Sequence, residues 1–368
     1  MLPAPFKLER YFAQYEFSVR YLLCASDCES LSVGELLALE PGAAARFERQ
    51  WLGYTETNGA PALRAEIAGL YETVSADEVL VHPGAEEAIF LFMQAALEPG
   101  DHVIVHWPCY QSHVEIAVSK GCLVSAWSGR EAQGWALDPD DLRRLLRPNT
   151  RAIVINSPHN PTGYQMAPEV LREIARIADE RGIWLFSDEV YRECEYDAGQ
   201  RLPAAADLGE RGVSLGSTSK TYGLPGLRIG WLAGHDRALL GKIVALKDYT
   251  TICTSAPSEF LAEVALRRRQ ALIERSLGTI RGNLALLDGF FARQAGRFTW
   301  VRPGAGPVGF PKLLGEAVEP FCDRLVRTAG VLLLPGPVFD DGGNHFRLGF
   351  GRKNMPEALA RLEEFLIN

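Results

Sequence analysis

The stretch from about residue 60 to residue 250 alternates short apolar runs with amphipathic helical patterns. Apolar runs this short, separated by helices, are typical of a mostly parallel sheet whose two faces are covered by helices. We expect strands at 102–107, 151–158, 183–189, 212–217 and 228–234, and helices at 60–74, 85–97, 138–146 and 167–182. Ligands of such sheets bind beyond the carboxyl ends of the strands, so the polar residues that follow each strand are candidates for a site.

After residue 236 the pattern changes to long helices followed by short strands. Helices are expected up to 247 and over 257–294, short strands at 298–303, 330–336 and 345–350, and a closing helix from 355. Strands grouped before a terminal helix favour a smaller α+β unit. We therefore predict an α/β protein with a large domain over 45–285 and a small α+β domain that combines 1–44 with 286–368.

Charge and composition argue against several kinds of partner. The chain has a formal net charge of -8 and no long basic run, so neither nucleic acid nor an anionic membrane is expected as its main partner. The longest apolar run, 88–97, is too short to cross a bilayer, and the N-terminus lacks the apolar core of a signal peptide. The seven cysteines are scattered without zinc-type spacing, which predicts free thiols, no metal site and a cytoplasmic location.

A set of polar and aromatic residues follows the expected strands. Its members are Tyr110, Asn160, Asp188, Tyr191, Ser217 and Lys220. Gly84 stands at the start of a helix, and Arg228 ends the loop STSKTYGLPGLR, whose small residues would let a ligand approach the backbone closely. Each residue alone has an ordinary explanation as a turn former, a helix cap or a surface side chain. Together at one sheet edge, they indicate a ligand site.

The chemistry of this set matches one cofactor. A helix N-terminus, an arginine and a serine bind phosphate. An aromatic ring stacks on a flat ring, a carboxylate pairs with a protonated ring nitrogen, and asparagine and tyrosine donate to a phenolic oxygen. A desolvated lysine condenses with an aldehyde. Pyridoxal 5'-phosphate (PLP) carries all of these groups and is held by a lysine as a Schiff base.

The motifs that carry these residues also resemble a known family. NPTG at 160–163, SDEVY at 187–191 and STSKTYGLPGLRIGW at 217–231 resemble the fold-type-I aminotransferases of the class I/II group. YTETNGAPALRAEIA, from residue 54, and FRLGFG, from residue 346, are similar to the same family, so the resemblance covers nearly the whole chain. It implies a large PLP-binding domain whose mostly parallel, seven-stranded-type sheet is sandwiched by helices.

The resemblance also implies a role for each residue around the cofactor ring. Lys220 would form the Schiff base and later shuttle a proton between the substrate α-carbon and the cofactor. Asp188 would keep the pyridine nitrogen protonated. Asn160 and Tyr191 would bond the ring hydroxyl oxygen, and Tyr110 would stack on the ring.

The phosphate and the substrate would be held at the two ends of the site. At the helix start that Gly84 precedes, the amides of Ala85 and Glu86 would bind the phosphate together with Ser217 and Arg228. Tyr54 would reach that phosphate from the neighbouring subunit, which implies a homodimer. Arg347, with Asn160 nearby, would clamp the substrate α-carboxylate in a bidentate pair.

Two places depart from the family pattern. Glu86 would put a carboxylate near the phosphate, so we expect only its backbone amide to be used. The segment YLLCASDCESLSVGELL, from residue 21, replaces a glycine-proline turn that covers the substrate in many relatives. Ser26 or Asp27 could face the substrate or cap the helix that follows, and we expect the cap. No arginine is assigned to a substrate side chain, although Arg20 and Arg302 are available.

Three functions are compatible with these residues. The first is a transaminase that moves an amino group between an amino acid and a 2-oxo acid. The second is a PLP-dependent lyase or cyclase of amino acid or natural-product metabolism, which the altered N-terminal segment motivates. The third is a PLP-sensing regulator with a fused DNA-binding module, which is disfavoured because the chain starts almost directly with the aminotransferase-like region.

Overall fold

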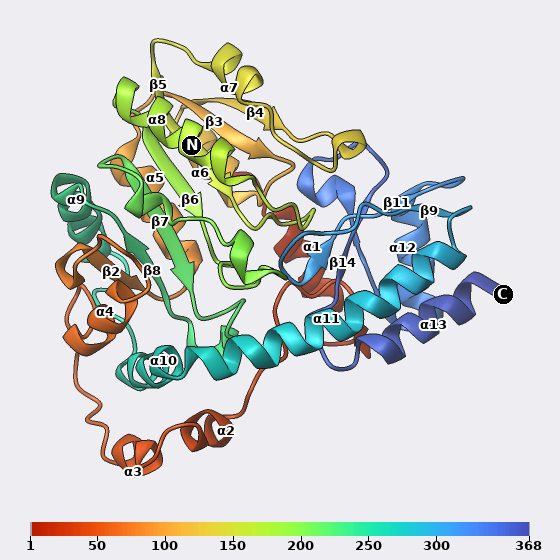
Figure 1. Ribbon diagram of the computed structural model, residues 1–368, viewed down its shortest axis with the longest axis horizontal. Helices are drawn as coiled ribbons and strands as arrows, with labels where there is room; N and C mark the ends of the chain where they lie inside the picture. The colour runs from red at the N-terminus through yellow and green to blue at the C-terminus, as the bar shows by residue number, and fades with distance from the viewer. Residues whose placement is uncertain (1, 368) are drawn as a thin grey trace.

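The computed structural model describes residues 2–367 and is built around a seven-stranded sheet of order β2-β8-β7-β6-β5-β3-β4 (Figure 1). The strands are β2 (Val79–His82), β3 (His102–Trp107), β4 (Leu123–Ser128), β5 (Thr150–Asn156), β6 (Trp184–Asp188), β7 (Gly212–Ser217) and β8 (Gly230–Ala233). Neighbouring strands are parallel except that β8 runs antiparallel to both β2 and β7. The predicted α/β architecture is therefore confirmed.

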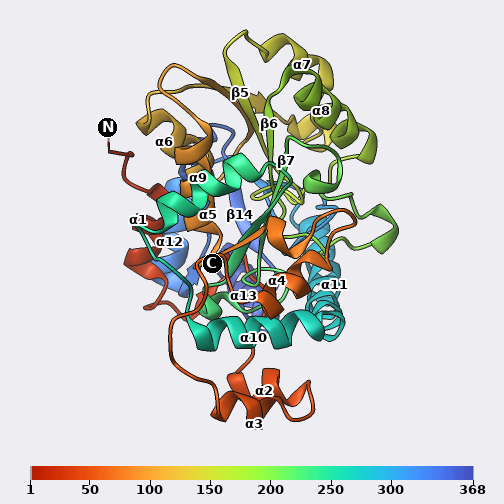
Figure 2. The same cartoon turned by 90° about the vertical axis from the view of Figure 1, so that its left-hand side faces the viewer.

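Helices cover both faces of the sheet (Figures 1 and 2). On one face lie α5 (Ala85–Ala96), α6 (Ser112–Ser119) and α9 (Arg237–Lys247). On the other face lie α4 (Pro61–Ala68), α7 (Pro139–Leu145), α8 (Pro168–Arg181) and α10 (Ala256–Arg267). Successive residues of a strand point to opposite faces, so strands covered on both sides are apolar at nearly every position.

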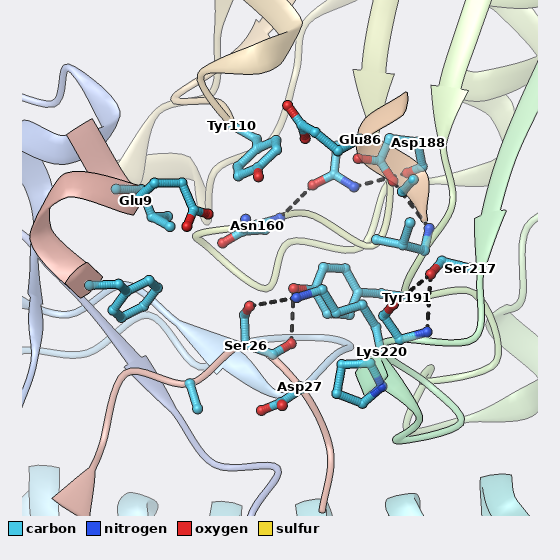
Figure 3. A pocket seen from close by; sticks show the side chains of 18 of the residues that line it. Glu9, Ser26, Asp27, Glu86, Tyr110, Asn160, Asp188, Tyr191, Ser217 and Lys220 are labelled. Carbon is cyan, nitrogen blue, oxygen red and sulfur yellow. Dashed lines mark hydrogen bonds between the residues drawn. The ribbon is translucent and has the colours of Figure 1, made fainter. Parts of the chain in front are cut away.

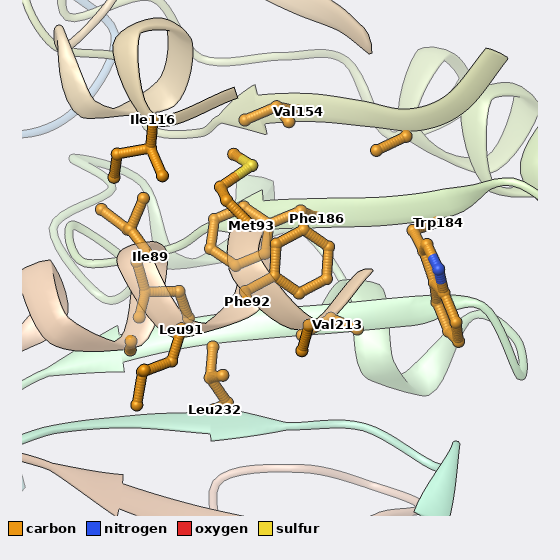
Figure 4. Close-up of a cluster of buried hydrophobic side chains, with 14 of the residues drawn as sticks. Ile89, Leu91, Phe92, Met93, Ile116, Val154, Trp184, Phe186, Val213 and Leu232 are labelled. Atoms are coloured by element: carbon orange, nitrogen blue, oxygen red, sulfur yellow. The ribbon is translucent and has the colours of Figure 1, made fainter. Parts of the chain in front are cut away.

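The core beneath α5 shows this packing (Figure 4). Phe92 of α5 contacts Phe186 of β6, with ring centroids 4.4 Å apart. Val154, Val213 and other residues of the neighbouring strands complete the cluster. Because α5 is anchored along its length on the sheet, its N-terminus is fixed beside the carboxyl ends of the central strands.

A second group of elements lies beside the large sheet, and Figure 1 shows α11 running from α10 toward it. Its helices are α1 (Lys7–Tyr15), α12 (Val318–Ala329) and α13 (Met355–Ile367), and its strands are β1 (Tyr21–Leu22), β9 (Phe298–Thr299), β10 (Val308–Gly309), β11 (Lys312–Leu313), β12 (Val331–Leu332), β13 (Leu334–Pro335) and β14 (Phe346–Gly349). β10, β14 and β13 form an antiparallel sheet, while β1 pairs with β12 in parallel. Because β14 belongs to this group, it can bring Arg347 toward the large sheet.

The remaining helices connect these parts. They are α2 (Val33–Ala38), α3 (Ala43–Glu48), α11 (Arg269–Arg293) and short 3-10 helices at Ala76–Glu78, Glu131–Gln133, Ala198–Gln200, Ala205–Asp207, Pro225–Leu227 and Gly336–Phe339. Among the described residues, no helix is both long enough and apolar enough to cross a bilayer.

Three sequence expectations differ from the structure. The strands β2 and β4 were not identified, because β2 is a short run without alternation and β4 is an edge strand with mixed burial. The helical region 257–294 is two helices, since Arg268 leaves helical geometry at φ -109° and ψ 19°. The expected cap is also wrong: Ser32, not Ser26 or Asp27, caps α2 by accepting a hydrogen bond from the amide of Glu35.

Candidate active site

A cavity of about 350 Å³ lies at the carboxyl ends of β5, β6 and β7, beside the N-terminus of α5 (Figure 3). Most of the predicted site residues line it: Ala85, Glu86, Tyr110, Asn160, Asp188, Tyr191, Ser217, Lys220, Arg228 and Arg347. Gly84 lies directly before Ala85, at the N-cap of α5. Tyr54 is the exception, since its side chain is 87% exposed. Residues from distant segments therefore meet in one cavity, as the strand-end argument predicts.

Lys220 follows β7 in the loop of small residues. Its Nζ donates a hydrogen bond to Oγ of Ser26, 2.8 Å away. Burial lowers the pKa of Lys220, because the cavity wall removes water from the ammonium group. A lowered pKa favours the neutral amine, which is the form that attacks a carbonyl.

Asp188 ends β6 and is 6% exposed. Its Oδ1 accepts a hydrogen bond from the amide of Val190 at 3.2 Å, and its Oδ2 lies 3.2 Å from Nε2 of His113 in α6. Asn156 of β5 donates to the backbone oxygen of Asp188. The carboxylate is thus held in one orientation, suited to a cationic ring nitrogen.

His113 and Asn156 are site residues that the sequence reasoning missed. Asn156 is the last residue of β5, and its Oδ1 accepts a hydrogen bond from the amide of Asn160 at 2.7 Å. One feature of the sequence could have identified His113 as a site residue. It stands three residues after Tyr110, where a helix follows the end of a strand. Only the three-dimensional fold, in which α6 packs on β3 and β4, shows that the His113 ring reaches Asp188 at the end of β6.

Arg347 of β14 is 1% exposed and reaches across to the large sheet. Its Nη1 donates to Oδ1 of Asn160 at 3.0 Å, and its Nε and Nη2 donate to the carbonyl oxygen of Cys24. Desolvation lowers its pKa. Among residues 2–367, no carboxylate lies within ion-pair distance of this guanidinium, so its buried charge lacks a counterion that an anionic ligand could supply.

The N-terminus of α5 forms an anion cradle with the loop after β7. Gly84 has φ +91°, and a Cβ atom there would lie 2.4 Å from Nη2 of Arg228. Only glycine therefore lets the guanidinium approach the start of the helix. Ser217 lines the same cavity. Backbone amides at a helix N-terminus, an arginine and a hydroxyl are the groups that hold a phosphate.

Glu86 is turned toward α6. Its carboxylate accepts a hydrogen bond from Oγ of Ser112 and interacts with the hydroxyl of Tyr110, and burial raises its pKa. This orientation turns the side chain of Glu86 toward Ser112 and leaves its backbone amide at the helix start. Binding of a ligand by that amide alone stays a prediction.

The segment at 24–28 faces the cavity rather than capping a helix. Ser26 accepts the hydrogen bond from Lys220, and its backbone oxygen accepts one from the hydroxyl of Tyr191 at 3.0 Å (Figure 3). Asp27 forms a bidentate pair with Arg352, with both contacts at 2.9 Å. Sequence order could not reveal this, because Arg352 is more than 300 residues away. Arg20 and Arg302 do not line the cavity.

These groups fit PLP. The Gly84–Arg228 cradle suits its phosphate, the amine of Lys220 its aldehyde, and the fixed carboxylate of Asp188 its ring nitrogen. The buried guanidinium of Arg347, which has no counterion among the described residues, could bind a carboxylate.

Comparison with known proteins agrees with this geometry. The family model for aminotransferase class I and II matches residues 26–362. The chain belongs to this family. The family uses PLP, so the predictions of the cofactor and of an aminotransferase-type enzyme are confirmed.

Three similar proteins cover nearly the whole chain. Capreomycidine synthase from Streptomyces vinaceus is 32% identical over 99% of this chain and 94% of its own length. A PLP-dependent aminotransferase from Streptococcus suis has a TM-score of 0.93 at 34% identity, covering 100% of this chain and 98% of that one. The PLP-dependent cyclase OrfR has a TM-score of 0.91 at 32% identity, with the same coverage. The likeness thus extends to enzymes named for two different reactions.

Proposed function

We propose that the chain transfers an amino group between an amino acid and a 2-oxo acid, with Lys220 as the residue that binds PLP covalently. This proposal rests on two groups that line the same cavity. One is the amine of Lys220, whose pKa is lowered, and the other is the guanidinium of Arg347, which is buried without a counterion among the described residues. A basic amine and a guanidinium without a counterion are what an α-amino acid requires for reaction and for binding.

The residues around the ring have distinct tasks in this proposal. When bound, PLP supplies a ring that withdraws electrons from the substrate α-carbon. Asp188 would hold the proton on the ring nitrogen, and Nε2 of His113 lies 3.2 Å from its Oδ2. Lys220 moves the proton at the α-carbon through its Nζ. Tyr191 and Asn160 would bind the ring hydroxyl, and Tyr110 would stack on the ring.

The outer groups bind the two ends of the reactants. The amides of Ala85 and Glu86, with Ser217 and Arg228, would hold the phosphate. Arg347 clamps the substrate α-carboxylate and keeps its contact with Asn160. A substrate held in this orientation would direct the C–H bond of its α-carbon toward the amine of Lys220.

The half-reaction tests this function directly. Holoenzyme mixed with a panel of amino acids, without an oxo acid, is followed by absorbance and by mass spectrometry of the released cofactor. We expect one equivalent of pyridoxamine phosphate and of 2-oxo acid for each site, and return to PLP when a 2-oxo acid is added. Turnover of an amino acid with PLP retained throughout and no oxo acid formed would contradict transamination.

A PLP-dependent cyclase or lyase is the second candidate, and one feature of the site favours it. Ser26 and the Asp27–Arg352 pair bring extra polar groups next to Lys220, where they could direct proton transfer at the substrate side chain. The similarity to capreomycidine synthase and to a cyclase over the whole chain supports this reading. In the same assay, this function would yield a rearranged or cyclic amino acid while the cofactor stays PLP.

We further propose a homodimer in which Tyr54 reaches the partner's phosphate site. Tyr54, Trp51, Leu52 and Tyr249 are each more than 75% exposed, which is unusual for large apolar side chains. Three of these side chains lie within residues 51–54, and exposed apolar side chains of this kind suit an interface between two copies of the chain.

Tyr54→Phe should weaken PLP retention by roughly 1.5 to 3 kcal/mol, because it removes one hydrogen bond to a charged group. The equilibrium dissociation constant of PLP measures this. Mixing Tyr54→Phe with Lys220→Ala subunits gives hybrid dimers with one intact site if Tyr54 acts across the interface. Activity above the sum of the parents is expected, and confirmed subunit exchange without such a gain would contradict the shared site.

The predicted domain division and cellular setting also remain proposals. Pairing of β1 with β12 supports joining residues 1–44 to residues 286–368, although α2 packs on α10 of the large part. All seven cysteines are free thiols, which supports a reducing cytoplasm. A role in amino acid metabolism or biosynthesis rests on the proposed amino transfer alone.

A further inference from the structure

The inner face of α1 places carboxylates in the cavity. Glu9 and Phe12 of α1 and Glu16, its C-cap with helical dihedral angles, follow one another at spacings of three and four residues, so they share one face, and all three line the cavity. Figure 3 shows the carboxylate of Glu9 directed toward the space beside Tyr110 and Asn160. This face therefore forms the wall opposite the strand ends that hold the cofactor groups.

Glu9 and Glu16 have no cation of their own. Within residues 2–367, neither carboxylate forms an ion pair. The cations nearby are engaged elsewhere, because Arg352 is bound by Asp27 and Lys220 donates to Ser26. Burial raises the pKa of Glu16, and the charge of Glu9 raises it further. Arg352 and Lys220 lower the pKa of Glu16 without pairing with it, so neither carboxylate has a direct ion-pair partner among the described residues, and a cationic ligand would favour their charged forms.

Phe12 lies between the two carboxylates on the same face. The face of an aromatic ring attracts a cation, and flanking carboxylates add to that attraction. A carboxylate on a substrate side chain would instead meet like charges here. The wall is therefore suited to a positively charged group and unsuited to an acidic one.

The position of the substrate gives an independent reason to expect a ligand at this wall. In the proposed function Arg347 binds the α-carboxylate and the α-amino group would react at the cofactor aldehyde in place of Lys220, so the side chain must extend into the rest of the cavity. Resting on the proposed function, we infer that Glu9, Phe12 and Glu16 select an amino acid whose side chain ends in a guanidinium or ammonium group.

Arginine and citrulline test this inference, because they have nearly the same shape and differ in side-chain charge. Each is titrated into holoenzyme, and the change in the visible absorbance of the cofactor gives a dissociation constant. We expect arginine to bind at least about tenfold more tightly than citrulline, with the difference shrinking as salt is added. Lysine against norleucine repeats the comparison for an ammonium group.

The double variant Glu9→Gln with Glu16→Gln keeps the shape of the wall and removes its charge. We expect the arginine to citrulline preference to fall to about one while the citrulline affinity stays unchanged. Glu210→Gln, at an exposed carboxylate before β7 that does not line the cavity, is the matched control and should keep the preference. PLP content and circular dichroism check that each variant is folded.

Several outcomes would overturn the inference. These are equal binding of arginine and citrulline to the wild-type enzyme, tighter binding of aspartate than of arginine, or a preference for arginine that survives in the double variant. The assay also separates this inference from the proposed function. Conversion of neutral donors without a preference for arginine refutes only the selection by α1, whereas preferred binding of arginine without amino transfer refutes only the transaminase.

Discussion

Replacing Lys220 with alanine should reduce turnover by more than about 10³-fold, because the chain loses both its nucleophile and the group that moves the substrate proton. The loop around Lys220 offers hydroxyl groups but no second amine in the cavity. Steady-state rates with the best donor from the panel measure this loss. A small primary amine added to the solution should restore part of the rate, since it can replace the missing amino group.

Lys242→Ala is the matched control for this variant, because Lys242 is exposed on α9 and lies outside the cavity. It should retain the wild-type rate. The Lys220→Ala protein should still bind PLP without a covalent bond, since the phosphate cradle and Asp188 remain. A turnover near that of the wild type would show that another group does the chemistry.

Asp188→Asn should lower kcat by about 10² to 10³, because a neutral amide cannot hold the proton on the ring nitrogen. A buried charge interaction of this kind is worth several kcal/mol, and about 1.4 kcal/mol corresponds to a factor of ten in rate. The amide has nearly the size of the carboxylate and can still accept the hydrogen bond from Val190. The effect therefore reports on charge rather than on shape.

Asp188→Glu is the matched comparison, since it keeps the charge and alters the geometry. We expect it to lose far less activity than Asp188→Asn. Equal losses in the two variants, or near-normal rates in the asparagine variant, would mean that Asp188 is only a structural residue at the end of β6.

The sequence allowed the prediction of those site residues that lie in contiguous motifs at strand ends. Lys220 and Arg228 share one loop, and Asp188 and Tyr191 share another. The alternation of strands and helices places these loops at one sheet edge, because the carboxyl ends of parallel strands meet there. Local patterns were thus sufficient for the large sheet and for most of the groups that fit PLP.

The missed residues depend on contacts between distant segments. Asp27 contacts Arg352, and the amine of Lys220 reaches Ser26, while α2 begins only at Val33, too far along the chain for either residue to cap it. The N-terminal helix carries Glu9 and Glu16 to the cavity only because it packs beside it. Neither periodicity nor spacing specifies such packing, which is set by side chains from both ends of the chain.

The covalent site of the cofactor is the most direct test of the whole account. The purified holoenzyme is reduced with borohydride, which fixes PLP to its lysine, and is then digested and mapped by mass spectrometry. The account predicts one label per chain, on Lys220, and none in the Lys220→Ala protein. A label on a different lysine, or reduction that leaves every lysine unmodified in active enzyme, would contradict it.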